Sequence, residues 1–149
     1  MNWLLAICVL IGVLATAEDL WRRQISNKTT VAAFGLGLAA QTALHGLKGA
    51  GNSLAGTFIG FMVFFVFFLL GGMGAGDIKL MGGFGAVLGA SQTLQAAFLT
   101  AIVGALFAML YLLVRKMRKP QTTPDAGERE AIPYAPAITV GVLLSFAAR

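Results

Sequence analysis

Charge is confined to a few short segments of this chain, and that confinement limits what the chain can fold into. Only 11% of the residues are charged, whereas a soluble domain carries about 25%. The charged segments leave five uncharged runs, at residues 1–17, 29–47, 49–76, 80–114 and 131–148. Because a helix that crosses a bilayer needs roughly 20 mostly apolar residues, we expect nearly the whole chain to be embedded in a membrane.

This pattern excludes a soluble enzyme, a nucleic-acid binder and a disulfide scaffold. The net charge of +5 would suit nucleic acid, but the basic residues lie in loops between apolar runs, where they act as topology signals. The single cysteine, Cys8, lies inside the first run, so it can form neither an internal disulfide nor a Cys-x-x-Cys metal site. We interpret Cys8 as a thiol buried in the membrane.

We expect one all-α integral membrane domain with six transmembrane helices. The run 80–114 is too long for one ordinary span and breaks naturally at residues 89–93. A short glycine-rich helix before that break is tolerated where protein shields its backbone. The expected helices cover about residues 2–17, 30–46, 53–71, 77–90, 94–114 and 134–148, with a solvated loop at 115–131.

The basic residues orient these helices. With six spans, one face of the membrane receives nine of the eleven Lys and Arg residues: Arg22, Arg23, Lys28, Lys79, Arg115, Lys116, Arg118, Lys119 and Arg129. The positive-inside rule makes that face cytoplasmic and places both termini on the other side. Residues 15–17 resemble a signal-peptidase site, but no basic residue precedes the first apolar run, so we expect this helix to be retained.

Three of the six acidic residues lie at the ends of expected helices. Glu18 and Asp19 follow the first helix and Asp77 begins the fourth, so all three are expected at the same cytoplasmic depth. Carboxylates at a membrane boundary are costly and tend to be functional. A structural role stays open, in which Asp19 and Asp77 cap helices or pair with Arg22 and Lys79. The remaining acids lie in the long loop and are expected to be solvated: Asp125, Glu128 and Glu130.

Glycines precede Asp77 in a GxGD motif, Gly74-Ala75-Gly76-Asp77, at the start of an expected helix. Glycine lets another backbone approach closely and tolerates strained dihedral angles, which suits a site where an extended peptide lies against the acid. A phosphate-binding loop is excluded, because no Gly-Lys-Ser/Thr follows and no strand precedes the glycines. Plain helix packing stays open, since Gly72 and Gly76 are four residues apart.

Three patches together resemble the type IV prepilin peptidases, the GxGD membrane aspartic proteases. Asp19, Ile25 and Asn27 resemble the family's D-x5-I-P-N segment, with a serine where proline is usual. Residues 74–80, GAGDIKL, match its GxGD-x-K-L patch, and residues 132–138, IPYAPAI, resemble its proline-rich entry to the last helix. The resemblance implies the fold of these proteases and spans most of the chain.

The resemblance assigns Asp19 and Asp77 as the catalytic pair and leaves Glu18 as a neighbour. It also implies that five residues bind substrate or shape the site: Gly74, Gly76, Lys79, Ile25 and Asn27. For Lys79, an interfacial charge that reaches toward water remains the alternative.

The implied activity is an endopeptidase that removes the leader of a type IV prepilin. Such an enzyme lies in the inner membrane of a bacterium, cuts after a glycine at the cytoplasmic face, and works beside pilus or secretion assembly proteins. Because the chain begins in a span and has one cysteine, it resembles the small protease-only members, such as those serving Flp (tight-adherence) pili. We then expect no methyltransferase activity, metal or cofactor. Two alternatives stay open: a small ion-coupled transporter and a non-catalytic assembly subunit.

Overall fold

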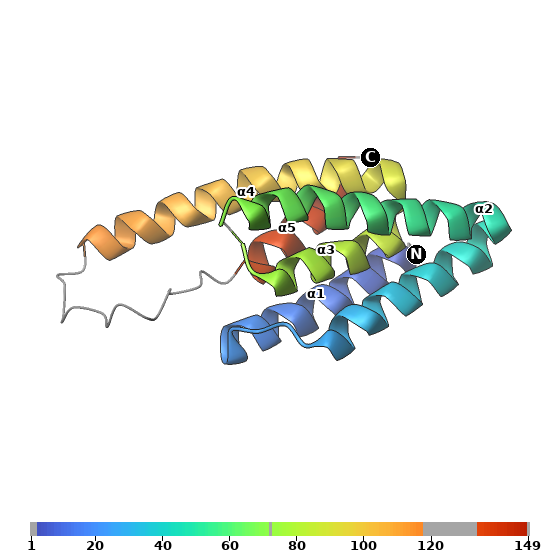
Figure 1. The fold of residues 1–149 in the computed structure, drawn as a ribbon, viewed down its shortest axis with the longest axis horizontal. Coiled ribbons are helices and arrows are strands. Elements are labelled where there is room, and N and C mark those ends of the chain that lie inside the picture. The colour runs from blue at the N-terminus through green and yellow to red at the C-terminus, as the bar shows by residue number, and fades with distance from the viewer. Residues whose placement is uncertain (1–2, 72, 118–133, 149) are drawn as a thin grey trace.

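The chain folds into α-helices throughout the part that the computed structural model describes, residues 3–71, 73–117 and 134–148. The helices are α1 (Trp3–Arg22), α2 (Asn27–Leu69), α3 (Ala75–Leu88), α4 (Ala90–Met117) and α5 (Ala135–Ala147). Successive helical segments run back and forth between the two ends of one bundle (Figure 1). The expected all-α class is confirmed. Residues 118–131 of the expected loop lie outside the described residues.

A sharp reversal at Gly46 divides α2 into two arms that spread apart from that residue, and α3 packs against both of them (Figure 1). Gly46 has φ 61° and ψ −144°, in the left-handed region that favours glycine. The expected helices 30–46 and 53–71 are therefore the two arms of α2. The expectation of a loop between them is wrong, because the helix resumes directly after Gly46.

The helix ends differ from the expected ones where a single residue breaks the helix. α1 continues past residue 17 to Arg22, and Arg23 then takes a φ of 50°. The expected break at 89–93 shrinks to Gly89, with φ 78°, so α4 begins at Ala90. Glu18 and Asp19 therefore do not end α1. The helices end at residues with positive φ, Arg23 after α1 and Gly89 after α3.

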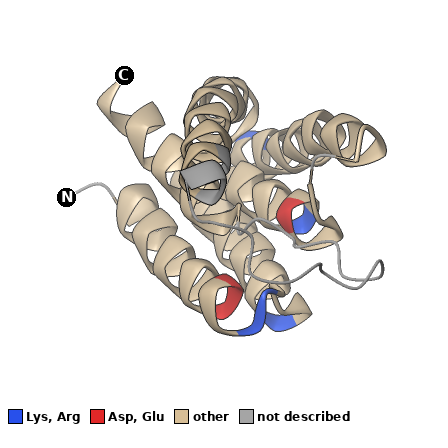
Figure 2. Cartoon of the chain, turned by 90° about the vertical axis from the view of Figure 1, so that its left-hand side faces the viewer, with Lys and Arg blue, Asp and Glu red and all other residues tan. Residues whose placement is uncertain are grey.

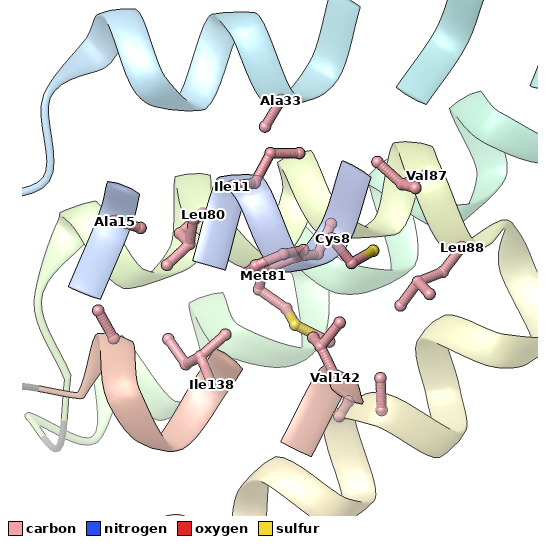
Figure 3. Close-up of a cluster of buried hydrophobic side chains, with 14 of the residues drawn as sticks. Cys8, Ile11, Ala15, Ala33, Leu80, Met81, Val87, Leu88, Ile138 and Val142 are labelled. Atoms are coloured by element: carbon pink, nitrogen blue, oxygen red, sulfur yellow. The ribbon is translucent and has the colours of Figure 1, made fainter. Parts of the chain in front are cut away.

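The core is built around α3, which contacts all four other helices. Every residue of α3 from Leu80 to Leu88 is buried. Its glycines bring the backbones close: a Cβ on Gly85 would overlap the carbonyl of Gly56 in α2. The buried side chains that pack around α3 come from α1, α2 and α5 (Figure 3): Cys8, Ile11, Ala15, Ala33, Ile138 and Val142.

The outer surface of the bundle is apolar. Leu47 and Trp21 are 90% and 87% exposed, and such surface is typical of a face that contacts lipid. Three helices are long and apolar enough to cross a membrane, Trp3–Arg22, Asn27–Leu69 and Ala90–Leu110, and α5 is a shorter apolar helix. The described residues thus form an all-helical membrane protein, and the full set of six spans stays a prediction.

Candidate active site

Asp19 and Asp77 line one pocket at the end of the bundle where α1 ends and α3 begins. The pocket has a volume of about 190 Å³. Both side chains are buried, with 7% and 6% of their surface exposed. Figure 2 looks onto this end and shows acidic and basic segments gathered on neighbouring helix ends. The two aspartates therefore share a small polar site at one end of an apolar bundle.

Asp19 is held by the start of the last helix. The backbone N–H of Ala135 donates a hydrogen bond to Oδ2 of Asp19, over 3.0 Å. Ala135 is the first residue of α5, so the positive end of that helix dipole faces the carboxylate. One turn further along α5, the hydroxyl oxygens of Thr139 and Thr16 lie 3.3 Å apart, within hydrogen-bond distance. This second contact keeps α5 against α1 just below the site.

Asp77 is held by its own helix. The N–H of Gly74, the N-cap residue of α3, donates to Oδ2 of Asp77 over 3.1 Å. This is the carboxylate half of a capping box, so the capping role considered from the sequence is present at Asp77. Among the described residues, Oδ2 of each aspartate accepts one hydrogen bond and Oδ1 accepts none. Capping and a place in the pocket therefore coexist.

The two motif glycines do not relieve backbone strain. Gly74 has φ −84°, and the glycines with positive φ in the described chain are Gly46, Gly71 and Gly89. The tolerance of glycine for strained dihedral angles is therefore not used at Gly74 or Gly76. Gly76 instead permits a close approach, since a Cβ there would lie 3.3 Å from Cβ of Ile25 and 3.6 Å from its backbone nitrogen. Ile25 lines the same pocket as the acids.

Lys79 and Asn27 lie beside this pocket rather than in it. Nζ of Lys79 donates a hydrogen bond to Oδ1 of Asn27 over 3.0 Å, and both side chains are exposed. Together they line a separate groove of about 440 Å³ between the arms of α2, with Phe34 and Phe61 on its walls. The structure thus brings Gly74, Gly76 and Ile25 to the two aspartates. The other two predicted residues, Lys79 and Asn27, line the neighbouring groove.

Other groups also form this site. Arg23 and Gln24 line the acidic pocket, and the N–H of Ala135, which sequence reasoning missed, reaches Asp19. Glu18 does not line the pocket, but its carboxylate accepts hydrogen bonds from Ser26 and Thr29. Two hydroxyl residues at the start of the next helix were the available signal for Glu18. Within the described residues, no cluster of three or more His, Cys, Asp or Glu side chains is placed to hold a metal ion.

Two buried carboxylates in one pocket are suited to acid–base chemistry. Like charges in close proximity disfavour joint ionisation, so one group can keep a proton while the other is ionised. Such a pair can donate a proton and accept one in the same reaction. The hydrogen bonds from backbone N–H groups to Oδ2 fix how each carboxylate is oriented.

Comparisons with known proteins agree on one family. The profile described as type IV leader peptidase family matches residues 4–109, which include both aspartates. Over 111 residues the chain is 32% identical to a prepilin leader peptidase/N-methyltransferase of Bacillus subtilis (strain 168). That alignment covers 73% of this chain and 41% of the relative, so the chain spans less than half of that protein. No solved structure gives a significant match.

Proposed function

Because the chain belongs to the type IV leader peptidase family, we propose that it is an aspartic endopeptidase that removes the leader of a type IV prepilin. The observation that carries the proposal is the shared pocket of Asp19 and Asp77. The relative's name also includes a methyltransferase, but we propose peptidase activity alone, because the acidic pocket suits peptide hydrolysis.

The proposed mechanism uses the two carboxylates in complementary states. The ionised aspartate takes a proton from a water molecule, which attacks the scissile carbonyl carbon. The protonated aspartate donates its proton to the carbonyl oxygen, and the roles exchange as the amine leaves. The Oδ1 atoms are the natural reacting oxygens, because each Oδ2 already accepts a backbone hydrogen bond.

The substrate we propose has a polar leader followed by an apolar helix. The acidic pocket lies at one end of the bundle, where Arg23 offers a positive charge to an acidic residue of the substrate. An apolar pocket of about 180 Å³ begins at Tyr134, the residue before Ala135, and includes Met73 and Phe64. The start of the substrate's apolar helix suits the apolar pocket and the polar leader suits the charged end of the bundle. The bond to be cut would then lie at the junction, beside the two aspartates.

The location and partners follow from the same reasoning. The positive-inside rule supports a cytoplasmic position for the charged end of the bundle, and the alternating segments of Figure 1 support six spans. We propose that the protein resides in the inner membrane of a bacterium and works beside pilus or secretion assembly proteins. Flp-type prepilins are the proposed substrates, because the chain resembles the peptidases that serve those pili.

Peptide cleavage in detergent tests this proposal. The probe is a synthetic peptide with a polar leader, a glycine at the junction and an apolar segment, and mass spectrometry identifies the products. We expect one cut after the glycine, and a peptide without that glycine serves as the control. A folded protein that cuts neither peptide at any pH from about 5 to 8 would contradict the proposal and favour a transporter or an assembly subunit.

A further inference from the structure

Glu18 joins the end of α1 to the start of α2 through three hydrogen bonds. The N–H of Ser26 donates to Oε2 of Glu18 over 2.9 Å, and the hydroxyl of Ser26 donates to Oε1 over 3.0 Å. The hydroxyl of Thr29 donates to the same Oε1 over 2.8 Å. Ser26 is the N-cap of α2 and also accepts from the N–H of Thr29. One carboxylate therefore binds both the N-cap residue and a residue of the first turn of α2.

The charge of Glu18 strengthens this arrangement. Hydrogen bonds to an ionised carboxylate are stronger than those between neutral groups. The carboxylate also lies at the N-terminus of α2, where the helix dipole favours negative charge. Glu18 thus makes a favourable contact at the only covalent connection between α1 and α2, the turn of residues 23–26.

That turn forms one wall of the acidic pocket. Arg23, Gln24 and Ile25 all line the pocket with the two aspartates. Arg23 has φ 50°, an unfavourable backbone conformation for a residue with a side chain, which persists only where surrounding contacts enforce it. Ile25 packs on Gly76, the residue before Asp77. The position of the turn therefore decides how closely the pocket wall approaches Asp77.

We propose that Glu18 is a positioning residue that holds the turn of residues 23–26 against α3 and so sets the width of the acidic pocket. The proposal deepens the peptidase function proposed above and rests on it only for the activity measurement. Glu18 does not line the pocket, so it acts through Ser26 and Thr29. Loss of its contacts frees the turn and moves Ile25 away from Gly76.

An engineered disulfide reports the position of the turn without any activity. Ile25→Cys with Gly76→Cys places two Cβ atoms about 3.3 Å apart, close to the range of about 3.5–4.5 Å found in disulfides. Cys8 is fully buried and does not compete. We expect oxidant to cross-link this pair, and adding Glu18→Gln to slow cross-linking several-fold, because the neutral amide lacks the charge that strengthens the hydrogen bonds to Ser26 and Thr29. An unchanged rate would overturn the proposal.

A matched pair of threonine variants sharpens the cross-linking test. Thr29→Val removes one bond to Glu18, whereas Thr30→Val removes a local bond from its hydroxyl to the carbonyl of Asn27. The substitution is the same and the positions are adjacent. We expect Thr29→Val to slow cross-linking and Thr30→Val to leave it unchanged. Equal rates in both variants would contradict a specific role for Glu18.

A rescue experiment connects the turn to cleavage. Ser26 has φ −70° and ψ 146°, and proline fixes φ at about −65°. Ser26→Pro therefore rigidifies the turn while removing both Ser26 donors to Glu18. We expect Glu18→Gln to lower the rate of peptide cleavage about tenfold or more in the natural chain. In a chain that already carries Ser26→Pro, we expect the same substitution to lower the rate much less. Equal losses in both backgrounds would overturn the positioning role, whereas a natural chain that cuts no peptide contradicts only the peptidase function.

Discussion

The backbone N–H of Ala135 donates a hydrogen bond to Oδ2 of Asp19, which ties the first residue of α5 to the end of α1. Asp77 accepts the corresponding bond from Gly74, the N-cap of its own helix. Both carboxylates therefore lie at a helix N-terminus, where negative charge is favoured. The last helix thus takes part in the site although its sequence carries neither aspartate.

The contact between α1 and α5 below this bond can be perturbed in a controlled way. A Cβ on Gly12 would overlap Cγ2 of Thr139, and inserting a methylene into a packed core typically costs about 1–3 kcal/mol. We expect Gly12→Ala to lower both thermal stability in detergent and peptide cleavage. Adding Thr139→Ser removes Cγ2 and should restore part of both.

Gly35→Ala is the control for that substitution, because no atom of the described residues lies within 4 Å of a Cβ there. Alanine is favoured over glycine in a helix by up to about 1 kcal/mol, so we expect equal or higher stability. If Gly12→Ala behaved like Gly35→Ala, the packing of α5 on α1 would not be as described.

The two glycines of the GxGD motif should differ in their tolerance of alanine. A Cβ at Gly76 meets Ile25 at 3.3 Å, whereas among the described residues a Cβ at Gly74 meets only Oδ2 of Asp77, at 3.4 Å. We expect Gly76→Ala to reduce cleavage more than Gly74→Ala, because Ile25 must move away from the pocket. Initial rates for both variants on one peptide check this order, and the reverse order would contradict the close approach seen at Gly76.

Lys79 and Asn27 should behave as a coupled pair. Their hydrogen bond is exposed, and a typical bond of this kind contributes about 0.5–1.5 kcal/mol. We expect Lys79→Met and Asn27→Ala each to lower stability slightly, and the double variant to lose less than the sum. Thermal unfolding of all four proteins measures the coupling, and strictly additive losses would mean that the contact contributes nothing.

The order of helical segments could be predicted from the sequence, because charge is confined to the chain reversals. The details of each reversal could not. Gly46, Gly49 and Gly51 lie close together, and only the folded backbone decides that Gly46 takes the left-handed conformation. In the same way, Glu18 and Asp19 marked the end of an apolar run, yet the helix continues to Arg22 because neither residue breaks a helix.

The site was predictable where side chains carry a motif. The family resemblance carried by Asp19, Ile25 and the GxGD motif indicated residues that the structure places around one pocket. The N–H of Ala135 could not be found in this way, because a backbone group has no signature in the sequence. The role of Glu18 depends on how the following turn folds, so its partners emerge only from the structure.

The most direct test of the account is cleavage of the prepilin peptide by three matched variants: Asp19→Asn, Asp77→Asn and Asp125→Asn. The substitution is the same in each, and Asp125 belongs to none of the three motif patches, so we expect it to be solvated. We expect Asp19→Asn and Asp77→Asn each to lower the rate by at least about a hundredfold, with folding intact, and Asp125→Asn to cut at the natural rate. If either Asp19→Asn or Asp77→Asn cut the peptide at the natural rate, the claim that these two aspartates form the catalytic pair would be contradicted.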